Sequence, residues 1–182
     1  MASIARLGLL SHLGAERLPH RSVALESAQR KRKGKRVPNG GLLHSYANLY
    51  FNARNPMMSR LVNGGEQGIV VLRFTAKALD IPGAVIADGN AASSHVRFFA
   101  SPEGLENLDT LSVFARSWVC DDPFEQAERK RQCCAELLVP NKIAPEFIFG
   151  CYTLTPEDRD ETYAACQSQW RVEVNRNVYL LR

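Results

Sequence analysis

The sequence predicts an α+β protein built on a mixed sheet. Strand-like and helix-like segments are interspersed along 182 residues without the regular alternation of parallel βαβ units. No Gly-rich phosphate loop follows a strand, which argues against a doubly wound fold. The length fits one domain, residues 1–182, and an apolar fraction of 45% allows that domain to bury a core.

The chain begins with two helix-like segments and a loop. Residues 3–10 predict a short helix that ends at Gly8. Residues 22–33 predict a second helix, with Ser22 as its N-cap and basic residues at its far end. Gly and Pro then predict a loop over residues 34–41.

Strands dominate the next part of the chain. Apolar runs that are β-branched or aromatic and bounded by turn residues predict strands over residues 45–51, 68–75 and 84–87. We expect a helical turn after Pro56 and a helix start after the turn at Asp88-Gly89.

Two proline-marked helices organise the second half. Prolines at the first turn predict helices over residues 123–132 and 155–169, the latter with Thr155 as N-cap. Apolar runs predict strands over residues 133–140, 145–154 and 171–181. The pattern of residues 103–117 does not decide between helix and strand.

One short segment supplies all the excess positive charge. The formal net charge is +4, and removal of the run "RKRKGKR" leaves 17 basic against 19 acidic residues, a net charge of −2. Such a focused field attracts polyanions such as nucleic acid. The alternative interpretation of the basic run is a solvated loop that binds no partner. This basic arm consists of Arg30, Lys31, Arg32, Lys33, Lys35 and Arg36.

Cysteine usage and hydropathy predict a cytoplasmic protein with no membrane partner. The five cysteines form no CxxC pair, the first residues lack the apolar core of a signal peptide, and no run approaches the roughly 18 apolar residues of a membrane span. We expect reduced thiols and no metal. Cys133 and Cys134 are interpreted as small buried apolar residues rather than as reactive thiols.

Two charged residues stand out against apolar surroundings. Arg54 follows the strand-like run in "NLYFNARNPMM", and Glu136 lies inside "CCAELLVP". A carboxylate among apolar neighbours is costly unless it is paired or functional. Strand alternation offers the other interpretation, in which Glu136 faces solvent while Ala135 and Leu137 face inward.

Five segments in this order resemble the DarT family of DNA ADP-ribosyltransferase toxins. They are "LHSYANLYFNARNPMM", "VVLRFTAKAL", "ADGNAAS", "CCAELLVPNKIAPEFI" and "RVEVNRNVYLL". The resemblance implies a compact ADP-ribosyltransferase-like fold with a mixed, mostly antiparallel split sheet and flanking helices. It also implies that NAD⁺ supplies ADP-ribose to a base, commonly thymine, in single-stranded DNA. A macrodomain antitoxin is the expected partner.

The resemblance assigns roles to particular residues. Arg54 matches the family's catalytic arginine, which also contacts NAD⁺, and Glu136 matches its catalytic glutamate. Residues 38–56 match the NAD-binding element, and residues 95–136 match the substrate-facing loop, the ADP-ribosylating turn-turn loop. Ser3 and Ser11 are expected as further NAD⁺ contacts.

The expected DNA contacts combine cations with two ring side chains. The basic arm together with Lys130 and Arg131 is expected to bind phosphates. Tyr46 and His95 are expected to stack on or touch an unpaired base. The alternative for each is structural, since an aromatic on a strand often belongs to the core and a lone histidine is often only hydrogen-bonded.

The start of the sequence departs from the family pattern. The family's first strand carries a histidine that grips nicotinamide, and "MASIARLGLL" begins inside the helix that follows that strand. Either the chain start is set too late, or the chain is a shortened homologue that binds single-stranded nucleic acid or an antitoxin without efficient catalysis. Guanine in DNA, or RNA, remains an alternative acceptor.

Overall fold

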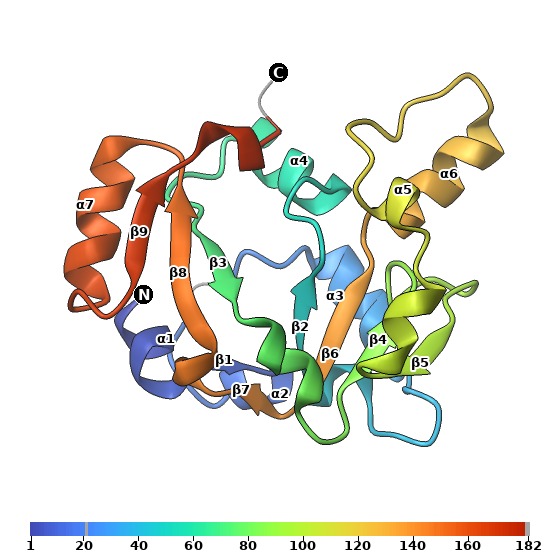
Figure 1. Cartoon of the computed structure of the whole chain (residues 1–182), viewed down its shortest axis with the longest axis horizontal. Helices are drawn as coiled ribbons and strands as arrows, with labels where there is room; N and C mark the ends of the chain where they lie inside the picture. Colours follow the sequence, from blue (N-terminus) through green and yellow to red (C-terminus); the bar gives the residue numbers. More distant parts are fainter. Residues whose placement is uncertain (21, 181–182) are drawn as a thin grey trace.

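Two sheets lie side by side at the centre of the molecule (Figure 1). The chain is described here by a computed structural model that covers residues 1–20 and 22–180. The four-stranded sheet is antiparallel throughout, in the order β2 (Tyr46–Tyr50), β6 (Glu136–Pro140), β4 (Val85–Ala87) and β5 (Phe98–Ala100).

The second sheet is mixed. Its order is β3 (Val71–Phe74), β8 (Ile148–Thr153) and β9 (Arg171–Val174). β3 and β8 are antiparallel, whereas β8 and β9 are parallel. A small antiparallel pair joins β1 (Leu9–Leu10) to β7 (Lys142–Ile143). The prediction of a split, mixed and mostly antiparallel sheet is therefore confirmed.

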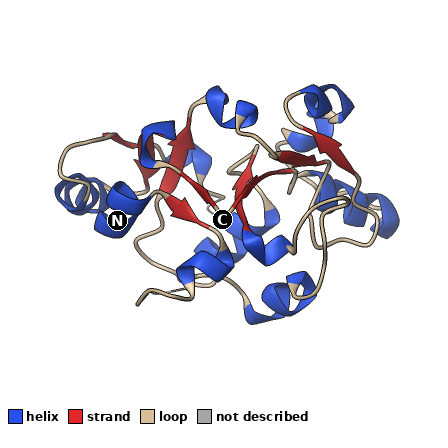
Figure 2. Cartoon of the chain, turned by 90° about the horizontal axis from the view of Figure 1, so that it is seen from below, coloured by secondary structure: helices blue, strands red, loops and turns tan. Residues whose placement is uncertain are grey.

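Helices surround the two groups of strands, as the view from below shows (Figure 2). The α-helices are α1 (Ala2–Leu7), α2 (His12–Ala15), α3 (Glu26–Arg32), α4 (Pro56–Asn63), α5 (Thr110–Val113), α6 (Pro123–Gln132) and α7 (Pro156–Ala165). Short 3₁₀ turns are η1 (Leu43–Ser45), η2 (Ala76–Asp80), η3 (Glu103–Asn107), η4 (Pro145–Phe147) and η5 (Arg176–Val178). Helix α7 covers the outer side of β8 and β9 (Figure 1).

Strand β6 is buried on both faces. Leu137 and Val139 join one apolar cluster, while Leu138 joins another that contains Val37 and Tyr46. Successive side chains of a strand point to opposite faces, so Glu136 shares the face of Leu138. This face meets the segment that contains α3 and the loop after it, which determines where the Glu136 carboxylate lies.

Side-chain turns shorten or replace three predicted elements. Ser22 is not a helix cap, because its hydroxyl accepts the Ala24 N–H and α3 begins only at Glu26. No helix follows Asp88-Gly89, because the Asn90 side chain accepts the Ala92 N–H and forms a turn. The predicted strand over residues 171–181 ends at Val174, and Asn175 starts the η5 turn. Residue 181 lies outside the described residues.

Asn55 fixes the start of α4, and its loss should destabilise the fold. Its buried side chain, 2% exposed, accepts the N–H groups of Met57 and Met58 at 3.0 Å and donates to the Asn52 carbonyl at 2.8 Å. We expect Asn55→Ala to lower the free energy of unfolding by about 1–2 kcal/mol, measured by urea denaturation. Asn63→Ala, at the exposed end of the same helix, is the control and should change it far less.

Candidate active site

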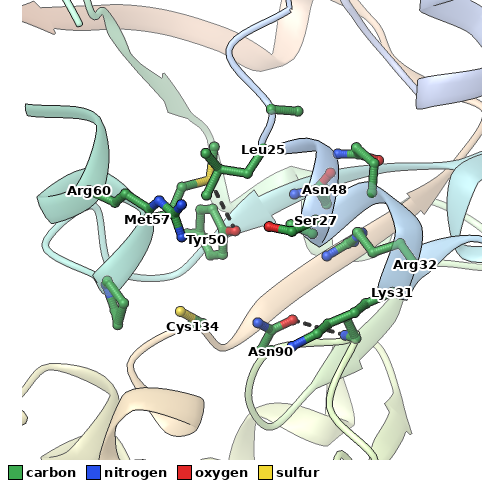
Figure 3. A pocket seen from close by; sticks show the side chains of 15 residues that line it. Leu25, Ser27, Lys31, Arg32, Asn48, Tyr50, Met57, Arg60, Asn90 and Cys134 are labelled. Carbon is green, nitrogen blue, oxygen red and sulfur yellow. Dashed lines mark hydrogen bonds between the residues drawn. The ribbon is translucent and has the colours of Figure 1, made fainter. Parts of the chain in front are cut away.

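A cavity of about 380 Å³ opens where the basic arm meets the ends of β2 and β6 (Figure 3). Its volume falls within the range of small-molecule sites. Polar and charged side chains reach it from three elements: Lys31 and Arg32 from α3, Asn48 and Tyr50 from β2, and Arg60 from α4. Asn90 and Cys134 complete the wall of the cavity (Figure 3).

Glu136 lies behind the wall of this cavity. It is the first residue of β6, it pairs with Tyr50 of β2 and Ala87 of β4, and its side chain is 0% exposed. Its two oxygens accept two guanidinium N–H groups of Arg32, at 3.1 and 3.0 Å, and Oε1 also accepts the Ala91 N–H at 2.9 Å. The interpretation in which Glu136 faces solvent is therefore wrong.

Burial sets the protonation of the groups around Glu136. Burial alone lowers the pKa of Arg32, but the facing carboxylate more than offsets this, so the pKa is raised. Burial and the Glu136 charge raise the pKa of Tyr50, and they raise the pKa of Cys134 to about 12. The Cys134 thiol therefore stays protonated at neutral pH and is no nucleophile. Burial of Cys133 and Cys134 confirms their interpretation as small apolar residues.

Arg54 lies at the same end of the four-stranded sheet but points elsewhere. It follows Tyr50 by four residues, and its N–H donates to the Asn52 side chain at 2.8 Å. The Asn52 amide holds the loop by donating to the Val113 carbonyl of α5 at 2.9 Å. The Arg54 guanidinium donates to the backbone carbonyl of Asn177 in η5, and Arg54 does not line the cavity. Its catalytic role stays a prediction.

The structure does not bring Ser3 or Ser11 to this cavity. Ser3 lines a separate cavity of about 400 Å³ between α1 and the chain after α7. Ser11 caps α2 by accepting the Gly14 N–H, and its own N–H donates to the Asn141 carbonyl. Asn141 directly follows Pro140, the last residue of β6, and Pro140 follows Glu136 by four residues, so the length of β6, roughly 13 Å, separates Asn141 from Glu136.

The basic arm is divided between the interior and the surface. Arg32 is buried against Glu136 and is not exposed with the rest of the arm, so its contact with a DNA phosphate stays a prediction. Lys35 donates to the Ser93 carbonyl, and burial followed by the nearby Arg32 lowers its pKa. The other four cations are exposed: Arg30, Lys31, Lys33 and Arg36.

A second hollow of about 560 Å³ continues from the cavity towards α6. It shares Lys31, Asn90 and Cys134 with the first cavity, and it is also lined by Lys130 and Arg131. Lys130 is exposed, whereas Arg131 bridges Asp88 and Glu128 with N–O distances of 2.6 and 2.7 Å. Gly89 packs so closely on Arg131 that a Cβ would lie 2.8 Å from the Arg131 carbonyl oxygen. Arg131 therefore fixes this loop as well as lining the hollow.

The structure decides between binding and a structural role for Tyr46, but not for His95. Tyr46, 6% exposed, belongs to the core cluster of β6, and its hydroxyl accepts the Gly41 N–H at 3.2 Å. The structural interpretation of Tyr46 is therefore confirmed, and its buried ring is not available to a base. His95 is exposed in the loop before β5, where its contact with a base stays a prediction.

Sequence reasoning missed the cavity residues Asn48, Tyr50 and Arg60. The alternation of β2 places Tyr46, Asn48 and Tyr50 on one face, the face of Glu136, but the register that sets this is visible only in the fold. Residues 38–56 contribute Asn48, Tyr50 and Pro56 to the cavity wall, and residues 95–136 contribute Cys134. The assignment of these ranges to NAD⁺ and substrate stays a prediction.

The described part of the chain contains neither a cluster of metal-ligating side chains nor a membrane-spanning helix. Within residues 1–20 and 22–180, no three His, Cys, Asp or Glu side chains are placed to hold a metal ion. No helix in the same ranges has the length and apolar character needed to cross a bilayer.

The α+β fold, with a strand-borne glutamate beside a cation-lined cavity, agrees with the expectation of an ADP-ribosyltransferase-like protein. The chain belongs to the DarT family, because the model of that family, described as ssDNA thymidine ADP-ribosyltransferase, matches residues 1–180. This confirms the resemblance seen in the sequence.

Two curated relatives support the assignment. A DNA ADP-ribosyl transferase of Thermus sp. (strain 2.9) is 34% identical over 149 residues, which cover 76% of this chain and 69% of the relative. A DNA ADP-ribosyl transferase-DNA ADP-ribosyl glycohydrolase fusion protein of Thermosipho africanus (strain H17ap60334) is 33% identical over 156 residues. That match covers 82% of this chain and only 39% of the fusion protein.

Solved structures share the fold over nearly the whole chain. Thermus sp. 2.9 DarT in complex with ADP-ribosylated ssDNA has a TM-score of 0.85 and 28% identity, covering 98% of this chain and 90% of that one. The same protein in complex with NAD⁺ has a TM-score of 0.79 and 26% identity, covering 98% and 91%. Thermosipho africanus DarTG in complex with ADP-ribose has a TM-score of 0.86 and 27% identity, covering 100% and 48%.

Proposed function

We propose that this protein transfers ADP-ribose from NAD⁺ to a thymine base in single-stranded DNA. The observation that carries the proposal is the placement of Glu136 directly behind a cation-lined cavity, in a chain that matches the DarT family over residues 1–180. The solved complexes of Thermus DarT with NAD⁺ and with ADP-ribosylated ssDNA supply the two substrate classes.

The cavity suits the charge of NAD⁺. Lys31, Arg32 and Arg60 give its wall three cations, which complement a diphosphate. Asn48 and Ser27 add neutral hydrogen-bonding groups, and Tyr50 adds an aromatic ring. We infer that the diphosphate lies near these cations, with the nicotinamide ribose directed towards Glu136.

Glu136 would act on the departure of nicotinamide. The bond between C1′ of the ribose and nicotinamide breaks, and the sugar acquires oxocarbenium character. A carboxylate that accepts the ribose 2′-hydroxyl stabilises this charge. A ring nitrogen of the base then bonds to C1′ and releases its proton to solvent. Arg54 is proposed to stabilise the developing base anion, since a guanidinium stays charged and is a poor base.

The hollow beside the cavity supplies the proposed path for the DNA strand. Its cations Lys31 and Lys130, with Lys33 nearby in sequence, are exposed and available to phosphates. Action on a single strand avoids the free-energy cost of extruding a base from a duplex. His95, in the same loop region, is the proposed contact of an unpaired base.

Salt dependence tests this path. We expect Lys31→Ala combined with Lys33→Ala to lower the slope of log K against log salt concentration by about 1.4, at about 0.7 per phosphate contact on a single strand. Oligonucleotide binding measured by fluorescence anisotropy from low to high salt gives the slope. Lys77→Ala, an exposed lysine on η2, is the matched control and should leave the slope unchanged. An unchanged slope in the double variant would contradict the path.

We further propose that the protein is the toxin of a toxin–antitoxin pair that acts in the cytoplasm. The Thermosipho relative joins a DNA ADP-ribosyl transferase to a DNA ADP-ribosyl glycohydrolase in one chain. The proposed antitoxin is accordingly an enzyme that removes ADP-ribose from DNA, a macrodomain by the family resemblance.

Mass spectrometry tests the transfer itself. The protein is incubated with NAD⁺ and single-stranded oligonucleotides that contain either thymine or guanine as the only reactive base, and with an RNA counterpart. We expect the mass of one ADP-ribosyl group to be added to the thymine oligonucleotide. A mass shift only on the guanine or RNA substrate would replace the proposed acceptor. No shift on any substrate, together with salt-sensitive binding, would favour a binding module without catalysis.

A further inference from the structure

Four large apolar side chains lie exposed on α5, on α6 and on the segment between them. Their exposed fractions are 87% for Leu111, 56% for Phe114, 67% for Val119 and 86% for Phe124. α5 contacts α6, so these side chains, here called the apolar patch, belong to one region of the surface. Single apolar residues are normal on a surface, whereas a group of this size within 14 residues is typical of a site where another molecule binds.

Acidic residues surround the apolar patch. Residues 109–125 contain four acidic residues and one basic residue, a local net charge of −3 in a chain whose formal net charge is +4. Asp121, Asp122 and Glu125 are exposed and flank Phe124 in the sequence. These carboxylates repel phosphates, so the patch does not fit a nucleic-acid strand. It fits a protein surface that offers an apolar recess with positive charges around it.

Phe124 projects from a fixed backbone. It is the second residue of α6, after Pro123 at the first helical position, and its N–H donates to the Asp122 side chain at 2.8 Å. The cap and the proline fix the backbone from which the ring projects. An aromatic side chain has only two rotatable bonds, so it loses little conformational entropy when it enters a recess. Phe124 therefore has the properties of an interface anchor.

A groove with complementary properties lies on another part of the same molecule. Its volume is about 560 Å³, and it opens where η2 approaches β7 and η4. Its lining includes Ile81, Pro82, Phe147, Lys77, Lys142 and Asp80. Both lysines are exposed. The groove thus combines an apolar lining with a net positive charge, and its volume is large enough to admit an aromatic ring.

One chain cannot place its apolar patch in its own groove. β7 lies near the lower edge of the view and α6 at the upper right, so the two features occupy different parts of the molecule (Figure 1). Contact between the patches of two chains is unfavourable as well, because it would bring together two segments that each carry a net charge of −3. Among contacts between copies, the complementary one joins the patch of one chain to the groove of the next.

We propose that the apolar patch of one copy of this chain docks into the lysine-bearing groove of a second copy, with Phe124 as the anchor. The ring enters the apolar recess, and the acidic residues around it approach Lys77 and Lys142. The contact is heterologous, because it joins two different surfaces, so each pair keeps one patch and one groove for further copies. A single anchor in one groove gives a small interface, and association is therefore weak and increases with protein concentration. The inference goes beyond the proposed transfer reaction and does not depend on it.

Sedimentation velocity at increasing protein concentration, without DNA or NAD⁺, tests the contact. We expect the weight-average mass of the parent to rise above that of one chain, and high salt to reduce this rise because the charges around the groove are exposed. We expect Phe124→Ala to lower the association constant by about 10-fold or more, as the loss of an interface anchor does. Tyr163→Ala removes an aromatic side chain that is 50% exposed on α7, and this matched control should associate like the parent.

Reversal of the charges tests which two surfaces meet. One variant combines Lys77→Glu with Lys142→Glu, so that its groove and its patch are both negative. The other combines Asp121→Lys with Glu125→Lys, so that both surfaces are positive. We expect each variant alone to stay monomeric and an equimolar mixture to associate, because every patch then meets a groove of opposite charge.

General attraction between the two charge variants cannot explain association in the mixture. Their formal net charges are 0 and +8, four below and four above the +4 of the parent, so neither variant is negative overall. Circular dichroism reports the folded fraction of each variant before the two are mixed.

Three results would overturn the inference. A parent that has the mass of one chain at every concentration would show that the patch is not covered by a second copy. Parent-like association of Phe124→Ala would show that the anchor is assigned wrongly. Folded charge variants that remain monomeric when mixed would show that the patch and the groove do not meet.

Discussion

Replacement of Glu136 by glutamine is expected to reduce the rate of ADP-ribose transfer by about 10³-fold, by analogy with the loss of one well-placed electrostatic group. Glutamine keeps the size of the side chain and one acceptor oxygen for the Ala91 N–H. It removes the negative charge that would face the oxocarbenium-like ribose. The rate is measured at saturating NAD⁺ and oligonucleotide, so that weaker binding does not enter the comparison.

The same substitution leaves Arg32 without its counter-charge. Breaking a buried ion pair costs about 3–5 kcal/mol, and the opening of Arg32 to the cavity places the expected cost near the lower end. Urea denaturation measures this loss, and the rate is compared at a temperature where circular dichroism shows the variant to be folded. Glu173→Gln is the control. Glu173 lies on β9 and pairs with Arg73 of β3 at 2.7 Å, and its replacement should leave the transfer rate unchanged. Parent-like transfer by Glu136→Gln would refute the assigned role.

The strand that carries Glu136 could be predicted, but the direction of its side chain could not. Alternation identifies the buried face of a strand only when the other face is polar. Here Leu137 and Leu138 are both buried, because β6 lies between β2 and β4 with apolar clusters on both faces. The local pattern "CCAELLVP" was therefore equally compatible with a solvent-facing and a buried Glu136.

The basic arm shows a second limit of local reasoning. Six cations in seven residues have the composition of a solvated surface, and nothing in that run marks Arg32 as different. Its burial depends on a partner 104 residues away, and on the packing of the loop after α3 against β6. A prediction from composition treats the six cations as equivalent. In the fold, Arg32 is buried in an ion pair, whereas Arg30, Lys31, Lys33 and Arg36 are exposed.

Very short strands and turn-forming side chains account for most of the remaining differences. β1 and β7 have two residues each, too few for any periodicity to appear. The pairing of these strands nevertheless places Ser11 at the far end of β6 from Glu136. The order of the family-like segments therefore placed Glu136 on the correct strand. It did not predict that Ser11 lies at the other end of that strand.

Arg54 carries the other large expected effect. We expect Arg54→Ala to reduce the transfer rate by about 10²- to 10³-fold, since it would remove the charge proposed to stabilise the base anion. In the structure its guanidinium donates to the Asn177 carbonyl, so catalysis requires the side chain to turn from η5 towards the substrates. Arg54→Lys keeps the charge but not the planar fork, and it should recover only part of the rate. Single-turnover measurements with saturating oligonucleotide isolate this step.

The hydrogen bond to Asn177 gives Arg54 a competing structural role, and a control must separate the two. Because the acceptor is a backbone carbonyl, a change of the Asn177 side chain does not remove the bond. Arg176→Ala instead alters an exposed cation of the same turn and leaves the Arg54 contact in place, so it should transfer at the parent rate. Limited proteolysis reports the order of η5 in each variant. If Arg54→Ala loosens η5 while the transfer rate is unchanged, Arg54 is an anchor of the C-terminal segment and not a catalytic residue.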